Sequence, residues 1–189
     1  LMFSFLNLNA QTTLNTTAVS GFANNNGSGN VTFNFQNTNA FPIIITGIEG
    51  ITGSSGALVA ELWTHPSPVN SSSSVTVSTA NGWTQQATQA FTGVANSTTL
   101  ATQVYMSGIN VMIPAGTTVG MAVYASGQRY HTMVSPNIPL TTVAGGGCNI
   151  LMGTNISWGG GQPNVSASTN SPRAWLGKIT FVAATPCAG

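Results

Sequence analysis

Hydrophobic and polar residues alternate with a period of two along most of this chain. Residues 31–36 read Val-Thr-Phe-Asn-Phe-Gln, so that every second side chain is apolar. This alternation is typical of a β-strand that is buried on one face only. Residues 42–48 form an apolar run instead, which predicts a strand covered on both faces. Similar patterns predict further strands at residues 57–64, 74–78, 82–91, 100–107, 111–124, 129–134, 148–152 and 174–182.

Loops rich in Asn, Gly, Ser and Pro separate these segments, at residues 24–29, 66–73, 145–147 and 159–161. A turn is expected at Pro114–Gly116, inside the segment 111–124. No window of a dozen residues has helical spacing, and abundant Thr and Val with few Lys and Glu disfavour helices. Many short strands joined by turns predict an all-β single domain, residues 11–189, folded as an antiparallel β-sandwich or jelly roll.

Charged residues are nearly absent from the sequence, and this excludes several classes of partner. Of 189 residues only five carry a formal charge, and none is aspartate: Glu49, Glu61, Arg129, Arg173 and Lys178. The net charge of +1 offers no electrostatic attraction for nucleic acid or anionic lipid, so neither is expected as a partner. A charge near zero also gives little colloidal repulsion, which is typical of proteins that work anchored, glycosylated or assembled.

Residues 1–10 form an apolar run that ends in the small residue Ala10. This is typical of a signal-peptide remnant cleaved after Ala10, and it predicts export from the cell. The alternative is a retained N-terminal strand that pairs with a neighbour, because apolar side chains in this segment also alternate. No other stretch approaches the roughly 20 apolar residues of a membrane helix, so no membrane-spanning segment is expected.

Few side chains are available for catalysis or for binding a metal. Glu49 and Glu61 would have to face one cleft to act as a pair of carboxylates. His65 and His131 are the only histidines, and without aspartate they form neither a zinc site nor a catalytic triad. The sequence therefore predicts a protein without enzymatic activity, cofactor or metal.

Trp158 lies directly before the Gly-rich segment 159–161, with Asn155 and Gln162 nearby in sequence. A tryptophan beside amide side chains in a loop is a candidate platform for stacking a sugar, so Trp158, Asn155 and Gln162 are the predicted glycan-binding residues. The alternative is that Trp158 folds back and covers one end of the core.

Cys148 and Cys187 are the only cysteines, and an even number in an exported chain predicts one disulfide. The bond would close a loop of roughly 40 residues, which the chain-entropy treatment values at about 3–4 kcal/mol. The alternative is two buried free thiols.

Uncharged strands raise the question of what protects the edges of the sheets. Edge strands usually carry lysine or proline, which block pairing with other chains, and this sequence has one lysine. The edges are therefore expected to be covered by loops, protected by prolines, or used for self-assembly.

Several segments together resemble one known group of modules. They are residues 7–11, the run 29–39, the hairpin 113–120, and residues 145–150 with 153–155 and 159–161. They are similar to β-sandwich modules near the N-terminus of large Bacteroidota surface proteins exported by the type IX secretion route. The resemblance spans most of residues 12–187 and implies a role in adhesion or in cell-surface assemblies, with no catalytic motif to carry over.

These observations predict an extracellular or cell-surface protein without enzymatic activity. The first expectation is an adhesin or structural module that contacts a surface glycan or protein through neutral hydrogen-bonding loops. The second is a subunit of an extracellular filament or sheath, which assembles with copies of itself. The third is a carbohydrate-binding module of a larger enzyme.

Overall fold

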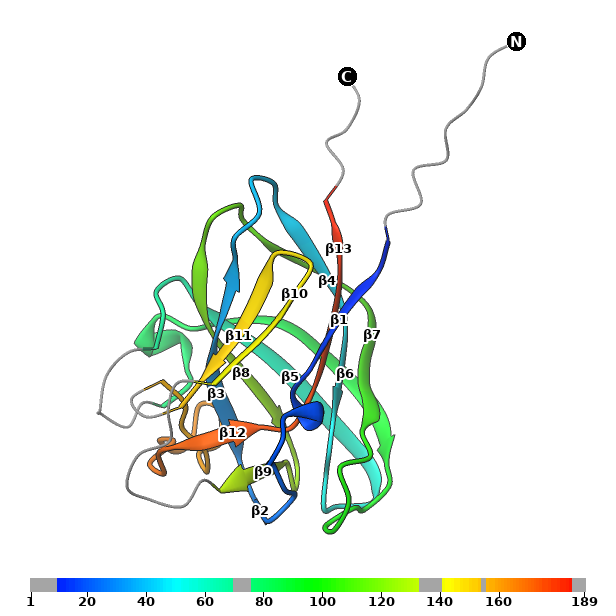
Figure 1. Ribbon diagram of the computed structural model, residues 1–189. Helices are drawn as coiled ribbons and strands as arrows, with labels where there is room; N and C mark the ends of the chain where they lie inside the picture. The colour runs from blue at the N-terminus through cyan, green and yellow to red at the C-terminus, as the bar shows by residue number, and fades with distance from the viewer. Residues whose placement is uncertain (1–9, 70–75, 133–140, 154–155, 185–189) are drawn as a thin grey trace.

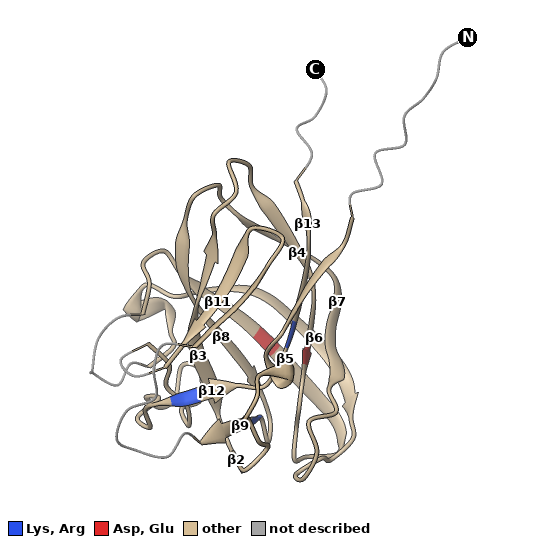
Figure 2. Cartoon of the chain, viewed as in Figure 1, with Lys and Arg blue, Asp and Glu red and all other residues tan. Residues whose placement is uncertain are grey.

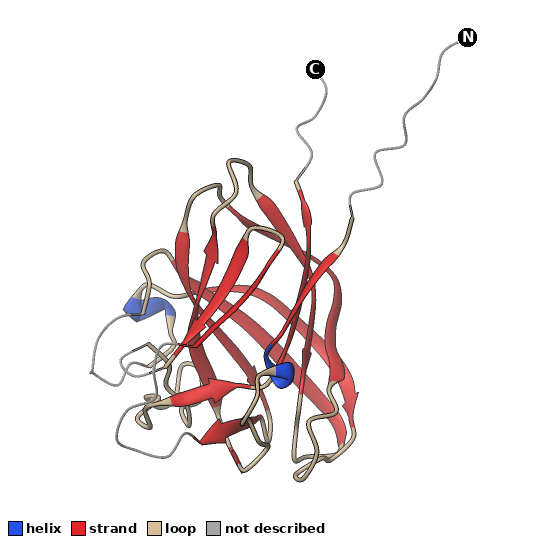
Figure 3. Cartoon of the chain, viewed as in Figure 1, coloured by secondary structure: helices blue, strands red, loops and turns tan. Residues whose placement is uncertain are grey.

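The structure, a computed structural model, describes residues 10–69, 76–132, 141–153 and 156–184 (Figure 1). Within these ranges the chain consists of β-strands with two short 3-10 turns, η1 (Thr16–Ala18) and η2 (Thr79–Asn81), as Figure 3 shows. The strands are β1 (Thr12–Asn15), β2 (Asn26–Gly27), β3 (Asn30–Asn37), β4 (Ile43–Gly50), β5 (Gly56–His65), β6 (Thr84–Gly93), β7 (Gln103–Ile113), β8 (Thr118–Ala125), β9 (Arg129–Thr132), β10 (Thr141–Gly145), β11 (Cys148–Met152), β12 (Arg173–Trp175) and β13 (Gly177–Ala183).

Two antiparallel sheets face each other and form a sandwich. One sheet has four strands in the order β1-β13-β4-β7, and the other has six in the order β10-β11-β3-β8-β5-β6. Along β3, β4 and β5, and again along β6, β7, β8 and β13, these main strands lie by turns in one sheet and the other, whereas β5 and β6 are neighbours in the larger sheet. This is the strand arrangement of a jelly roll. The β10–β11 hairpin extends the larger sheet beside β3, and a small sheet, β12-β9-β2, closes one end. The predicted all-β sandwich of jelly-roll type is confirmed.

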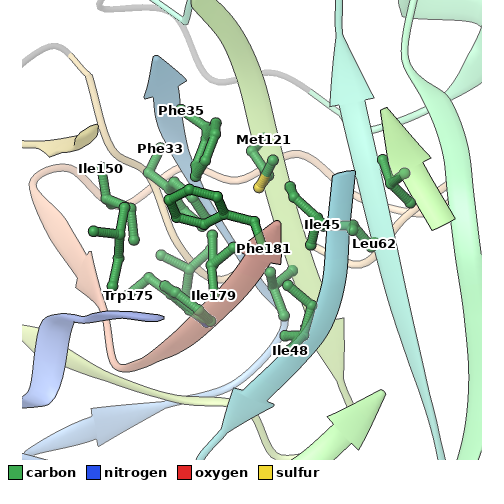
Figure 4. Close-up of a cluster of buried hydrophobic side chains, with 14 of the residues drawn as sticks. Phe33, Phe35, Ile45, Ile48, Leu62, Met121, Ile150, Trp175, Ile179 and Phe181 are labelled. Carbon is green, nitrogen blue, oxygen red and sulfur yellow. The ribbon is translucent and has the colours of Figure 1, made fainter. Parts of the chain in front are cut away.

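The core lies between the two main sheets, where their inward-facing side chains meet (Figure 4). Phe33 of β3 stacks on Trp175 of β12 with ring centroids 5.0 Å apart, and Phe35 meets the ring of Phe181 edge to face. A second, smaller cluster around Trp63 and Trp83 covers the outer side of the larger sheet at one end. The period-two pattern thus buries one face of each central strand.

Most predicted strands form close to their expected positions, and β11 has the expected bounds, Cys148–Met152. The predicted strand 174–182 is divided at Leu176 into β12 and β13, which belong to different sheets. Residues 76–78 form no strand, and the rest of the predicted strand 74–78 lies outside the described residues. Three short strands, β1, β2 and β10, were not predicted, because each has too few apolar positions to show a period.

The prediction that residues 42–48 are covered on both faces is wrong. Ile43, Ile45 and Ile48 of β4 are buried in the core, whereas Ile44 and Thr46 lie on the outer face and are partly exposed. Within the described residues no layer covers Ile44 and Thr46 on the outer face of the four-stranded sheet, so the apolar run continues onto a partly solvated surface.

Buried polar groups of β3 hold two long loops, one at Val69 and one that pairs with β3 through an isolated bridge between Val31 and Gly159. Thr32 donates its N–H to the carbonyl of Trp158 at 2.8 Å, and its hydroxyl accepts the N–H of Trp158 at 3.1 Å. Asn34 exchanges hydrogen bonds of 2.6 and 2.8 Å with the backbone of Val69. Neutral side chains therefore fix these loops without any ion pair.

Glutamine side chains join the neighbouring edge strands β6 and β7. Gln89 Oε1 accepts the N–H of Ser107 at 2.9 Å. Gln103 accepts the N–H of Val94 and donates to its carbonyl, both at 2.9 Å. On the other side of the sandwich, β1 lies beside β10. Strand addition at these edges would have to displace such contacts, so assembly of a filament through them gains no support from the described residues.

Candidate functional site

A groove of about 380 Å³ crosses the outer face of the four-stranded sheet. Among the described residues its lining combines neutral polar side chains, apolar side chains and a single carboxylate, without an aromatic ring. Its lining residues are Gln11, Thr46, Gly47, Ile48, Glu49, Val104, Met106, Ser107, Gly108 and Thr180.

Irregular pairing between β4 and β7 creates the groove. The register passes from Ile45 opposite Val111 directly to Gly47 opposite Ser107. This leaves Thr46 unpaired on β4 and residues 108–110 unpaired on β7. Gly108 has a φ of +65°, which a residue with a side chain rarely adopts, so the glycine permits this bulge. The unpaired residues on β4 and on β7 hold the side chains of the two strands apart. A hollow is left beside the backbone of Gly47.

Hydrogen bonds order the polar wall of the groove. Thr46 Oγ1 donates to the carbonyl of Thr180 at 3.3 Å and accepts from Gln11 Nε2 at 3.5 Å. The hydroxyls of Thr13 and Thr180 share a hydrogen bond of 3.1 Å. Ser107 is exposed at the opposite wall. The groove therefore presents positioned hydroxyl and amide groups that retain hydrogen-bonding capacity.

Glu49 lies at one end of the groove and is held by two donors. Lys178 of β13 is its register partner on the neighbouring strand, and Lys178 Nζ donates to Glu49 Oε2 at 2.7 Å. The hydroxyl of Thr102 donates to the same oxygen. Burial raises the pKa of Glu49, but the hydrogen bonds from Lys178 and Thr102 and the charge on Lys178 outweigh it. The pKa therefore lies below its usual value of 4.5, and Glu49 is ionised at neutral pH.

We expect the pair of Glu49 and Lys178 to stabilise the fold above the unfolded pKa of Glu49, near 4.5. Below that value the folded protein binds fewer protons than the unfolded chain, so this stabilisation is lost as the pH falls through the lower folded pKa. Both side chains are 30% exposed, so the contribution should be below about 1 kcal/mol. Urea unfolding of the wild type and Lys178→Met should show a difference that shrinks in acid, and a difference independent of pH would contradict this account.

Apolar side chains flank the polar lining on the same face. Val104 of β7 is 56% exposed at the groove, and Met112, further along the strand, is 62% exposed. Ile44 is the register partner of both Met112 and Val182, so these three form an apolar row across β7, β4 and β13. The outer face therefore offers both hydrogen bonds and apolar contact.

The two carboxylates do not share a cleft. Glu49 lies on β4 in the four-stranded sheet, whereas Glu61 lies on β5 in the larger sheet (Figure 2). Glu61 Oε2 accepts the indole N–H of Trp63 at 2.7 Å. Burial and the charge on Glu61 raise the pKa of Tyr124, its register partner on β8. These two glutamates therefore cannot form a paired-carboxylate catalytic site.

The histidines also lie apart from each other. His65 ends β5 and contacts the ring of Trp83, while His131 of β9 stacks on Phe22 with ring centroids 4.9 Å apart. Among the described residues no three His, Cys, Asp or Glu side chains gather at a position that could hold a metal ion. In the same part of the chain, no helix has the length and apolar character needed to cross a membrane.

The prediction of an exposed sugar platform at Trp158 is wrong. Trp158 is only 4% exposed, because the hydrogen bonds to Thr32 dock the loop and leave the ring no open face. The alternative is a tryptophan that folds back and covers one end of the core. Trp158 is buried, as that alternative expects, but it belongs to neither hydrophobic core cluster of the described residues. Gln162 is exposed and donates its N–H to Ser166 Oγ at 3.0 Å, and Asn155 lies outside the described residues.

Cys148 is buried, and its Sγ forms no disulfide within the part of the chain that the structure describes. Burial raises the pKa of its thiol to about 11. Cys187 lies outside that part, so the disulfide between them remains a prediction. The signal peptide or strand predicted at residues 1–10 likewise falls almost wholly outside the described residues, and β1 begins at Thr12.

Sequence reasoning missed the groove and its polar residues, Gln11, Thr46, Ser107 and Thr180. One local signal was present at Gly47, which interrupts the predicted strand 42–48, because an isolated glycine in a strand often marks a bulge. Gly108 lies between the predicted strands 100–107 and 111–124, which the structure joins in β7. Nothing in the sequence shows that these two bulges face each other.

Comparisons with known proteins assign no family to this chain. No family model matches it, and no curated protein matches its sequence. One similar solved structure is that of the infectious bursal disease virus Gt strain, with 13% identity and a TM-score of 0.28. The match covers 96% of this chain and 43% of the viral chain. At this TM-score the likeness carries no argument about fold or function.

Proposed function

We propose that this chain is a secreted, non-enzymatic module of a cell-surface adhesin, and that its outer-face groove binds a neutral glycan. The observation that carries the proposal is the lining of the groove, where hydroxyl, amide and carboxylate groups stand beside apolar side chains in about 380 Å³. A ligand pocket of this kind combines apolar contact with a few positioned polar groups that give specificity.

The chemistry of a sugar ring matches this lining. A pyranose carries hydroxyl groups around its edge and aliphatic hydrogens on its faces. Gln11 and Ser107 can exchange hydrogen bonds with the hydroxyls, while Val104, at 56% exposure, offers apolar surface to a ring face. Because Lys178 neutralises Glu49, the groove has no net charge that would select an ionic ligand.

The arrangement of the other polar residues also supports binding rather than catalysis. Glu49 and Glu61 lie in different sheets, so neither has a second carboxylate as a partner for acid–base chemistry. A carbohydrate-binding module of a larger enzyme would use the same groove in the same way, and it remains the alternative setting for this function.

Filling the groove should abolish glycan binding. A Cβ added at Gly47 meets only the carbonyl of Met106 at 3.5 Å and Thr180 Cβ at 3.8 Å, which are ordinary contacts. We therefore expect Gly47→Leu to fold and to occupy the hollow, and to weaken binding at least about tenfold. The measurement is a screen of the wild type on an array of neutral glycans, followed by titration calorimetry of the glycans that bind.

The matched control is Ala57→Leu, which adds the same side chain at an exposed position on β5 of the larger sheet. It should bind glycans as the wild type does, and both variants should show the wild-type thermal unfolding transition. Equal binding by Gly47→Leu and the wild type would exclude the groove as the binding site. A wild-type protein that binds no neutral glycan would overturn the proposed function.

A further inference from the structure

The ion pair at the end of the groove uses only one oxygen of the carboxylate. Lys178 Nζ and Thr102 Oγ1 both donate to Glu49 Oε2. Glu49 Oε1 accepts no hydrogen bond from the residues that the structure describes. Since a carboxylate oxygen accepts two hydrogen bonds, Oε2 is saturated and Oε1 is open.

The same contacts fix the orientation of the open oxygen. Glu49 and Lys178 are register partners on β4 and β13, and Thr102 directly precedes β7, so donors on both sides of β4 hold the carboxylate. Glu49 is also one of the residues that line the groove. A carboxylate held this way loses little conformational freedom when a ligand binds, which favours affinity.

Lys178 retains donors of its own. An ammonium group has three N–H donors, and within the described residues Lys178 uses one of them, at 2.7 Å from Glu49. Lys178 does not itself line the groove, but its Nζ lies 2.7 Å from Glu49 Oε2, so the ionised acceptor at the groove has an ionised donor directly beside it. Hydrogen bonds that involve a charged partner are stronger than neutral ones.

We propose that Glu49 and Lys178 together recognise a vicinal diol of a neutral sugar, an inference that rests on the proposed function of the groove. One hydroxyl of the diol donates to Glu49 Oε1, and the oxygen of the adjacent hydroxyl accepts from Lys178 Nζ. An amino sugar gains little affinity from this pair because Lys178 repels its ammonium group. A uronic acid binds more weakly because Glu49 repels its carboxylate. The pair thus selects neutral sugars that have two adjacent free hydroxyls.

The test uses the methyl glycosides of glucose, galactose and mannose, and the monodeoxy derivatives of whichever one binds. Glu49→Gln places an amide where the carboxylate stood, and Lys178→Met removes the donor while keeping the aliphatic stem. We expect each variant to weaken binding of the parent glycoside by at least about tenfold, the effect of losing one charge-assisted hydrogen bond. The control is Glu61→Gln, which changes the carboxylate of the opposite sheet and should bind as the wild type does.

The deoxy derivatives distinguish a direct contact from a structural effect. The wild type should bind the derivative that lacks the recognised hydroxyl as weakly as Glu49→Gln binds the parent glycoside. Glu49→Gln should bind this derivative with the same affinity as it binds the parent. The inference is overturned if Glu49→Gln lowers the binding affinity by the same factor for every deoxy derivative. It is also overturned if both Glu49→Gln and Lys178→Met bind the parent glycoside as the wild type does. Loss of binding in Gly47→Leu alone would leave the groove as the glycan site without the diol contact, whereas no binding by the wild type would remove both proposals.

Discussion

Replacing Asn37 with alanine should lower the free energy of unfolding by about 3 kcal/mol, because it leaves several buried backbone groups without partners. Asn37 is fully buried at the end of β3. Its Nδ2 donates to the carbonyls of Phe41, Ile113 and Pro114 at 3.0–3.3 Å, and its Oδ1 accepts the N–H of Asn39 at 3.0 Å. One amide thereby joins the loop after β3 to the β7–β8 hairpin.

Chemical denaturation of the purified protein would measure this effect. The matched control is Asn110→Ala, which removes the same side chain at an exposed position on β7 and should change stability by less than about 0.5 kcal/mol. An Asn37→Ala protein that unfolds at the wild-type denaturant concentration would show that water replaces the lost bonds at no cost, and would contradict the role given to this amide.

Like Asn37, other amide side chains of this nearly uncharged chain hold loops and strand ends by hydrogen bonds to the backbone. Asn34 anchors the loop at Val69, and Gln103 joins the ends of two edge strands. Amide and hydroxyl groups can both donate and accept, so they satisfy backbone groups without the desolvation cost of a buried charge. The scarcity of Lys and Asp therefore does not leave the described loops and edges unsupported.

Sequence periodicity predicted the central strands because burial on one face imposes it directly. In β3 the apolar residues alternate throughout, and in β11 the burial alternates although Leu151 interrupts the apolar alternation; both strands lie close to their predicted positions. β1 has one apolar residue, Leu14, so its pairing with β13 depends on tertiary contacts that no local pattern shows. Local pattern also failed for Trp158, whose burial depends on docking to a distant strand.

The groove could not be predicted because its residues come from four separate segments of the chain. Gln11 precedes β1, Thr46 lies on β4, Ser107 on β7 and Thr180 on β13. Their proximity depends on the strand order of the jelly roll and on two opposed bulges. Residue type alone indicated Trp158 as the binding residue, whereas the groove with its hydrogen-bonding groups lies on the four-stranded sheet.

The second large effect is expected at Gly177, which lies directly behind the proposed glycan site. A Cβ at this position would lie 2.3 Å from the carbonyl oxygen of Glu49 and 2.3 Å from Cζ2 of the Trp175 ring. Neither atom can move easily, because the carbonyl belongs to the paired strand β4 and Trp175 is fully buried against Phe33. Gly177→Ala should therefore destabilise the protein by about 3 kcal/mol through overpacking.

The new methyl group at residue 177 should also disturb the groove, because it displaces the backbone of Glu49, which lines the groove. We expect Gly177→Ala to shift the melting temperature downward and, in the fraction that remains folded, to change the NMR signals of Glu49 and Lys178. Gly47→Ala is the matched control on the same strand pair, since its new Cβ would meet nothing closer than 3.5 Å and should leave stability almost unchanged. Equal melting temperatures for the two variants would show that the close packing of Gly177 against Glu49 and Trp175 does not constrain this end of the sheet.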